Sequence, residues 1–309
     1  MTKYRDFESQ DLVYKLLPGE ERVRVARGDV SLHCSRIRSV ADTAKGTVVL
    51  LHGVASNGSR WEEFVETTDL RQDWDIIRMD LRGHAASVCR QKTRLEDWSE
   101  DLNAVLDAFG VERAVVIGHS LGAQVAMHYT AHNAERVLAL GLLDPLIEEA
   151  LTQKALDKRK LMPVVRVVES VTRRLNRLGF IRRLAPQDLR AMDARARDKI
   201  EKGGKELEEF IEEYSSTKAD LQYIHLATYS RDLLEVARPS PAPELLTVPT
   251  LVIGSSSGTF TDDVAMAEWV AKLPNARMRT VTCAHWPMTE CPAEVSKVIS
   301  DWVVEEVLS

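Results

Sequence analysis

The stretch GHSLG, at Gly118–Gly122, decides the fold class of this 309-residue chain. It follows the apolar run RAVVI at 113–117, which predicts a strand buried on both faces, and it precedes a helix-like segment. A G-x-S-x-G sequence at such a junction is typical of a tight strand-to-helix turn that exposes the serine hydroxyl. Ser120 is therefore a candidate nucleophile, and the alternative is a serine that only caps the helix.

Apolar runs on both sides of this motif predict further strands, at 46–52, 74–80 and 137–143. Amphipathic helical stretches separate them. The helix expected at 93–109 begins with a capping-box pattern, Thr93 to Glu96, and ends at Gly110. Two earlier strands are expected, at 22–26 and 31–38, and the second alternates as an antiparallel strand does. The pattern predicts an α/β fold, a mostly parallel sheet with helices on both faces.

The alternation of strands and helices stops at Pro145. From Leu146 to about Leu246 there is no convincing strand, and Arg, Lys, Glu and Leu recur at helical spacing. Strands resume at 248–253 and 276–283, and a helix is expected at 292–308. We therefore expect a core made of 1–145 and 247–309, with a helical cap or lid, 146–246, inserted after the sixth strand. Its apolar segments predict that the cap covers Ser120 and lines the substrate pocket.

A serine nucleophile needs a general base, and the base in turn needs an acid. His285 follows the last predicted strand and is the candidate base. Asp144 ends the strand 137–143, at the same sheet edge as Ser120, and is the preferred acid. Asp262 and Asp263 are alternatives, although helix capping explains both of them without catalysis. A site without any acid is the third possibility.

An oxyanion hole requires two backbone N–H donors. The amide of Leu121, directly after the serine, is one candidate. The amide of Val54, after the strand 46–52, is the other, with Ala55 as the alternative. Gly53 allows the backbone to approach the substrate closely. The residues expected to contact the substrate flank these groups: Gly53, His52, His119 and Trp286.

Six short motifs together resemble the α/β-hydrolase superfamily: LLHG (50–53), DLRG (80–83), GHSLG (118–122), VPTLVIG (248–254), LPNA (273–276) and AHWPMTECP (284–292). The resemblance covers essentially the whole chain outside the insertion, which stands where this family carries its helical lid. It implies a serine esterase or lactonase with a lid. Thioesterases and C–C bond hydrolases resemble this pattern too, whereas the serine argues against the aspartate-dependent dehalogenases and epoxide hydrolases.

One departure from the family concerns the acid. The family usually carries it just after the seventh strand, and here that position falls on Gly258, after Ser257. One subclass of haloalkane dehalogenases, and the fungal lactonases that open the macrolide zearalenone, carry an acid after strand six instead. Their arrangement resembles that of Asp144 and makes lactone opening a specific expectation.

The expected reaction is hydrolysis of a carboxylic ester or lactone through an acyl-enzyme. Thioester hydrolysis, C–C cleavage and a non-catalytic ligand receptor on the same fold are the alternatives. The substrate is expected to be small to medium and largely apolar. No metal or organic cofactor is implied, since His128 and His132, four residues apart, lack an evident third ligand.

Charge and hydropathy bear on partners and compartment. The formal net charge of −6 argues against a nucleic-acid partner. No apolar stretch has the length of a signal peptide or a membrane span, so we expect a cytoplasmic protein without a membrane partner. A basic cluster in the insertion is explained as a solvated helix face or as a contact for an anionic partner: Arg173, Arg174, Arg177, Arg182 and Arg183.

Overall fold

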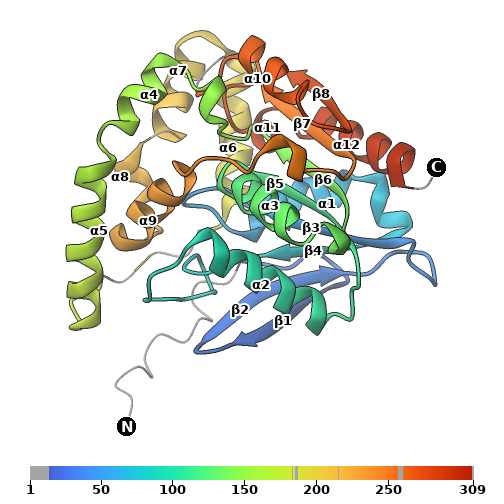
Figure 1. Ribbon diagram of the computed structural model, residues 1–309, viewed down its shortest axis with the longest axis horizontal. Coiled ribbons are helices and arrows are strands. Elements are labelled where there is room, and N and C mark those ends of the chain that lie inside the picture. The colour runs from blue at the N-terminus through green and yellow to red at the C-terminus, as the bar shows by residue number, and fades with distance from the viewer. Residues whose placement is uncertain (1–13, 183, 185–186, 215, 257–259, 308–309) are drawn as a thin grey trace.

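The computed structural model describes residues 14–182, 184, 187–214, 216–256 and 260–307, and its centre is an eight-stranded sheet. The strands lie in the order β1-β2-β4-β3-β5-β6-β7-β8 (Figure 1). Their bounds are β1 Glu20–Arg27, β2 Val30–Ile37, β3 Gly46–Leu51, β4 Trp74–Met79, β5 Ala114–His119, β6 Val137–Leu143, β7 Thr250–Ser255 and β8 Ala276–Val281. The first two strands pair antiparallel, whereas β3 to β8 run parallel. The carboxyl ends of the parallel strands therefore share one edge.

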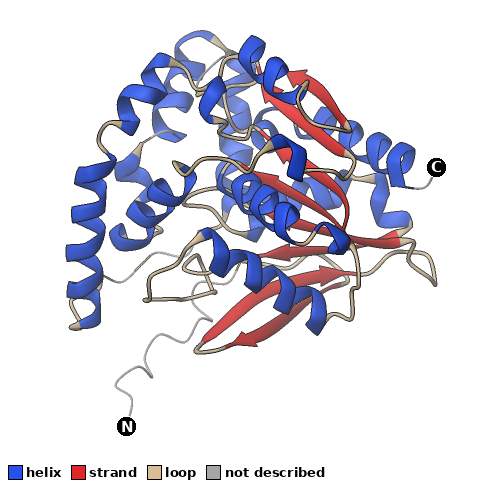
Figure 2. Ribbon diagram, in the orientation of Figure 1, coloured by secondary structure: helices blue, strands red, loops and turns tan. Residues whose placement is uncertain are grey.

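Side chains of the parallel strands point alternately into two apolar layers. In β3, Val49 and Leu51 belong to one cluster of buried residues, and Val48 and Leu50 belong to the other. Helices α2 (Leu95–Ala108), α3 (Leu121–His132) and α10 (Asp263–Val270) cover the first layer, while α1 (Glu62–Thr67) and α12 (Pro292–Val307) cover the second. Helices thus lie on both faces of the sheet, as the sequence predicts (Figure 2).

The segment between β6 and β7 forms helices grouped on one side of the sheet (Figure 1). Their bounds are α4 Gln153–Arg159, α5 Met162–Arg177, α6 Leu189–Lys202, α7 Gly204–Tyr214, α8 Thr217–Asp220 and α9 Leu226–Val236. The described part of 146–246 contributes no strand to the sheet. Helix α5 packs on α9 and forms the outer margin of the molecule.

The start of α2 differs from the expected one. The helix begins at Leu95, and the carboxylate of Asp97 accepts the Arg94 amide proton at 2.9 Å. The capping contact therefore lies one residue later than the pattern from Thr93 to Glu96 indicates. Thr93 is buried in the preceding loop, and Glu96 forms an ion pair with Arg238 instead.

Among the described residues, no helix combines the length and the apolar character needed to cross a bilayer.

Candidate active site

Ser120 lies in a strained turn between β5 and α3. Its backbone has φ 52° and ψ −111°, a conformation that costs free energy in a non-glycine residue. The flanking glycines make this turn possible. A Cβ atom on Gly118 would lie 2.1 Å from the Gly122 carbonyl oxygen, and one on Gly122 would lie 2.4 Å from that of Leu51. The strand, the turn and the helix therefore pack closer than any side chain allows.

The backbone of this turn continues the hydrogen bonding of the sheet. The Ser120 amide donates to the Leu143 carbonyl at 3.0 Å, and the Asp144 amide donates to that of Ile253 at 2.7 Å. Asp144 also has a positive φ, 44°, directly after β6. Two side chains that follow different strands are thereby held at the same edge.

His285 lies between these two side chains. Its Nε2 is 3.3 Å from Ser120 Oγ, and its Nδ1 is hydrogen-bonded to Asp144 Oδ2. All three residues are buried. With Nδ1–H donated to the carboxylate, Nε2 is the nitrogen left to accept the serine proton. The structure thus aligns a hydroxyl, an imidazole and a carboxylate in one row.

The alternative acids lie elsewhere. Asp262 caps α10, and its carboxylate accepts the amide protons of Val264 and Ala265 at 3.1 and 2.9 Å. Asp263 is the first residue of that helix, and burial, together with the charges of Asp262 and Asp144, raises its pKa. Gly258, the position where the family usually carries its acid, lies outside the described residues, as does Ser257.

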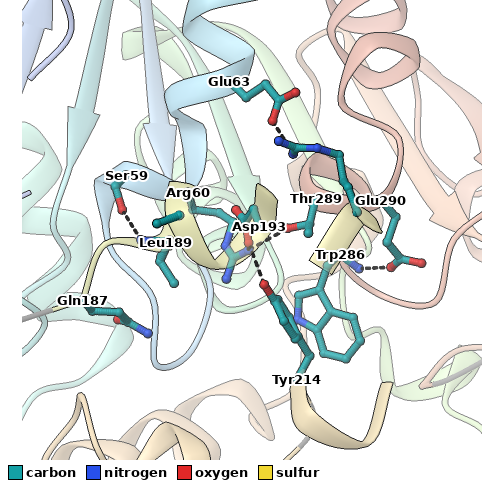
Figure 3. Close-up of polar contacts among 12 residues, drawn as sticks. Ser59, Arg60, Glu63, Gln187, Leu189, Asp193, Tyr214, Trp286, Thr289 and Glu290 are labelled. Atoms are coloured by element: carbon teal, nitrogen blue, oxygen red, sulfur yellow. Dashed lines mark hydrogen bonds and ion pairs between the residues drawn. The ribbon is translucent and has the colours of Figure 1, made fainter. Parts of the chain in front are cut away.

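Glu290 organises the loop that carries His285, and sequence reasoning missed it. Its carboxylate accepts three successive amide protons, those of Ala284, His285 and Trp286, at 2.8, 3.2 and 3.0 Å. Figure 3 shows its contact with Trp286. Glu290 ends the short helix α11, Pro287–Glu290. An acidic residue a few positions after the histidine was the available signal.

The loop after β3 lies directly against the serine. A Cβ on Gly53 would lie 3.3 Å from Ser120 Cβ and 3.1 Å from His119 Nδ1, so glycine allows this approach. Val54 follows on the cavity wall. Leu121 is the first residue of α3, so its amide has no carbonyl partner within the helix. The two expected donor segments therefore both border Ser120.

His52 is placed differently from our expectation. It is fully buried and does not line the cavity, so it is not a substrate contact. Its Nδ1 donates to the Gly53 carbonyl at 2.8 Å, and its Nε2 accepts the Leu81 amide proton at 3.0 Å. Burial lowers the pKa of His52 to about 3, so the ring is neutral and supports the loop.

His119 and Trp286 do line the cavity. His119 Nε2 lies 2.8 Å from the backbone oxygen of His285, and burial holds the pKa of His119 well below its usual range. Trp286 packs against Phe210 and Tyr214.

A cavity of about 580 Å³ opens above Ser120. Its floor is formed by core residues, and most of the remaining wall comes from the insertion. The insertion residues on this wall are Leu146, Lys158, Leu161, Met162, Val165, Gln187, Leu189, Met192, Glu213, Tyr214, Thr217, Ala219, Asp220, Gln222, Tyr223, Tyr229, Leu233 and Val236. The wall is apolar near α5 and more polar near α8. Burial raises the pKa of Asp220 to about 6.

A buried polar cluster joins the insertion to the core beside this cavity (Figure 3). Arg60 forms an ion pair with Asp193 of α6, and its Nη1 donates to Thr289 Oγ1 at 2.6 Å. The Tyr214 hydroxyl donates to Asp193 Oδ1 at 2.9 Å. Burial raises the pKa of Asp193, although Arg60 opposes this shift. Nearby, the Leu189 amide donates to Ser59 Oγ at 3.2 Å.

Comparisons with known proteins agree with this architecture. A family model described as the alpha/beta hydrolase fold matches residues 46–290. The chain is 24% identical, over 91% of its length and 94% of the relative, to a 2-hydroxy-6-oxononadienedioate/2-hydroxy-6-oxononatrienedioate hydrolase of Pseudomonas putida. It is 32% identical to a 2-succinyl-6-hydroxy-2,4-cyclohexadiene-1-carboxylate synthase of Serratia proteamaculans, a match that spans 29% of this chain and only 34% of that protein.

Solved structures extend the likeness to the fold. An enol-lactonase from Burkholderia xenovorans LB400 superposes with a TM-score of 0.66 at 16% identity, covering 91% of this chain and all of that one. The expected fold class and the resemblance drawn from the six motifs are both confirmed.

Proposed function

Because the chain belongs to the alpha/beta hydrolase fold family, we propose that it is a serine hydrolase that cleaves a carboxylic ester or lactone. One observation carries the proposal. Ser120 Oγ, the His285 ring and the Asp144 carboxylate form one hydrogen-bonded row, of which Ser120 and His285 line the cavity and Asp144 is buried behind them. This is the arrangement that activates a serine for acyl transfer.

The proposed reaction has two halves. Ser120 Oγ attacks the carbonyl carbon while His285 Nε2 takes its proton, and Asp144 stabilises the imidazolium that results. The oxyanion accepts hydrogen bonds from the amides of Leu121 and Val54. His285 then protonates the leaving alcohol, and an acyl group remains on Ser120. Water, deprotonated by His285, releases the acid.

The cavity supports a substrate of small to medium size. Its volume of about 580 Å³ lies within the usual range for small-molecule sites. Leu161, Met162 and Val165 give an apolar wall, and Gln187 and Asp220 give polar groups. This mixture supports a substrate that is apolar on one side and bears a hydrogen-bonding group on the other.

C–C bond hydrolysis is a second candidate, favoured by the Pseudomonas putida relative, which aligns with 91% of this chain. The name of that relative describes a dicarboxylate substrate. The cavity is lined by two positive charges, Arg60 and Lys158, and by two negative charges, Glu213 and Asp220. Arg60 is also paired with Asp193. A wall without excess positive charge suits a neutral ester or lactone better than a dianion.

A substrate panel tests the proposal. We expect p-nitrophenyl acetate and larger esters or lactones to be hydrolysed by the wild-type protein. The Ser120→Ala variant should lose about three orders of magnitude or more in rate, with little change in thermal stability. Preferred turnover of a thioester or of a vinylogous 1,5-diketone would move the assignment to those reactions. Unchanged ester turnover in Ser120→Ala would refute the serine mechanism, and binding without turnover would indicate a receptor.

A further inference from the structure

Helix α5 exposes apolar side chains along its whole length. In the part of the chain that the structure describes, seven of the twelve large apolar side chains that are exposed lie between Leu161 and Phe180. Those of α5 and its end recur every three or four residues, which places them on one side of the helix: Val164, Val167, Val171, Leu175 and Leu178. We call these five residues the outer stripe. Val167 is 63% exposed and Leu178 is 74% exposed.

The opposite side of α5 holds the helix in place. Glu169 is buried there and forms ion pairs with Arg173 and with Arg231 of α9. Met162 and Val165 line the cavity above Ser120. The helix is anchored through these residues, and packing among the described residues of the chain does not account for the outer stripe.

Positive charge flanks the outer stripe. Arg166, Arg174 and Arg177 are exposed, whereas the one acidic residue of α5, Glu169, is buried. At 3.6 residues per turn, the three arginines occupy one sector of the helix, which adjoins the stripe at Arg174 and extends round to Arg166 on the side that faces α9. This patch is strongly basic, although the whole chain carries a net charge of −6.

The basic flank continues beyond the helix. Arg166 borders a surface hollow of about 330 Å³ that Lys92 and Arg94 also line. The two acidic residues of this hollow, Glu96 and Glu235, both pair with Arg238. An anion at this surface would therefore meet several cationic side chains and carboxylates that are already paired.

We propose that α5 docks the protein onto an anionic lipid surface. The outer stripe enters the apolar boundary of the lipid layer, while the arginines contact the headgroup phosphates. An exposed apolar face flanked by arginines is the pattern of helices that lie in such an interface. A second copy of this chain fits less well, because an antiparallel two-fold contact through the stripe places the same flank of both helices together and brings like-charged arginines close.

This inference goes beyond the proposed hydrolysis and does not depend on it. It revises the sequence-based expectation that no membrane partner exists. Since one side of α5 lines the cavity and the other side faces the lipid, docking would place the wall of the cavity at the surface where lipid-soluble esters are dissolved.

Flotation with vesicles tests the docking, and the Ser120→Ala variant serves as the parent so that catalysis plays no part. Vesicles of phosphatidylglycerol and phosphatidylcholine are compared with vesicles of phosphatidylcholine alone. We expect binding to the anionic vesicles to fall at least tenfold in Val167→Gln/Val171→Gln. In Arg174→Gln/Arg177→Gln it should fall about fivefold for each arginine, with a weaker dependence on salt.

The matched control is Val40→Gln/Val264→Gln, which removes two valines from other surfaces and should bind like the parent. These valines are 68% and 69% exposed, more than Val167 at 63% and Val171 at 47%. Circular dichroism and thermal melting establish that each variant folds. Absence of parent binding, or equal binding by all variants, overturns the proposal. So does a parent dimer that Val167→Gln/Val171→Gln converts to a monomer, because the stripe is then a subunit interface. A protein that binds vesicles but hydrolyses no ester contradicts only the proposed function.

Discussion

Asp144 reaches His285 because its backbone turns sharply at the end of β6. A positive φ is uncommon in residues other than glycine, although aspartate tolerates it better than most. Here φ is 44°, and the Asp144 amide stays bonded to Ile253 while the carboxylate swings towards Nδ1 of His285. The positive φ at the end of β6 and the hydrogen bond to His285 therefore both depend on Asp144.

We expect Asp144→Asn to lower kcat for p-nitrophenyl acetate by about three to four orders of magnitude, because an amide favours the wrong tautomer of His285. Asp262→Asn is the matched control. It keeps an oxygen for capping α10 and should leave kcat nearly unchanged. Steady-state kinetics and thermal melting of both variants provide the measurement. If Asp144→Asn were active and Asp262→Asn inactive, the acid would be Asp262 instead of Asp144.

The residues of the site differ in how well the sequence predicts their positions. Ser120, Asp144 and His285 each follow a predicted strand, and parallel strands end at one edge, so their proximity follows from the strand pattern. Glu290 acts through three backbone amides, and such contacts depend on loop geometry that no periodicity encodes. The buried, supporting place of His52 likewise depends on the Leu81 loop, a distant segment.

Among the elements, α5 shows how one helix serves two surfaces. The sequence predicts that apolar segments of the insertion line the pocket, without assigning sides of this helix. The structure places Val165 on the cavity wall and Val171 on the outside. Hydrophobic periodicity identifies an amphipathic helix, but here both sides carry valines, and only the packing on α9 decides which side faces inward.

These two valines make a matched pair of tests. Val165→Ala should change the ratio of kcat/KM between a long-chain and an acetate ester by about threefold to tenfold, because roughly two methylenes of cavity wall are removed. The same substitution at Val171 should leave that ratio unchanged. Both variants are measured on soluble p-nitrophenyl esters, with the acetate rate as the internal reference. Equal effects at the two positions would mean that α5 does not select the substrate.

At the scale of the whole molecule, the Arg60–Asp193 pair joins segments that are 133 residues apart. Composition and spacing cannot pair two such charges, because the contact exists only after the insertion packs on the core. The mostly parallel sheet of the core, in contrast, follows from short-range alternation of strands and helices. The core was therefore predictable as an architecture, while the contacts between insertion and core were not.

Removal of Asp193 from this ion pair should destabilise the whole protein. We expect Asp193→Ala to lower the free energy of unfolding by about 3–5 kcal/mol, since it leaves the buried Arg60 guanidinium without its counter-charge. Arg60→Met/Asp193→Leu removes both charges and should lose much less. Urea titrations followed by circular dichroism measure both values. If Asp193→Ala unfolds at the same urea concentration as the wild type, the pair does not hold insertion and core together.

The hydrogen bonds from the amides of Ser120 and Asp144 into neighbouring strands have a consequence for motion during turnover. Amides of central strands generally exchange with solvent only when large parts of a protein unfold, and we expect the Ser120 and Asp144 amides to exchange as slowly. The nucleophile and the acid are thus fixed to the hydrogen-bonded central sheet. Any rearrangement that admits substrate or releases product on a faster timescale must come from the side chains and from the helices above them.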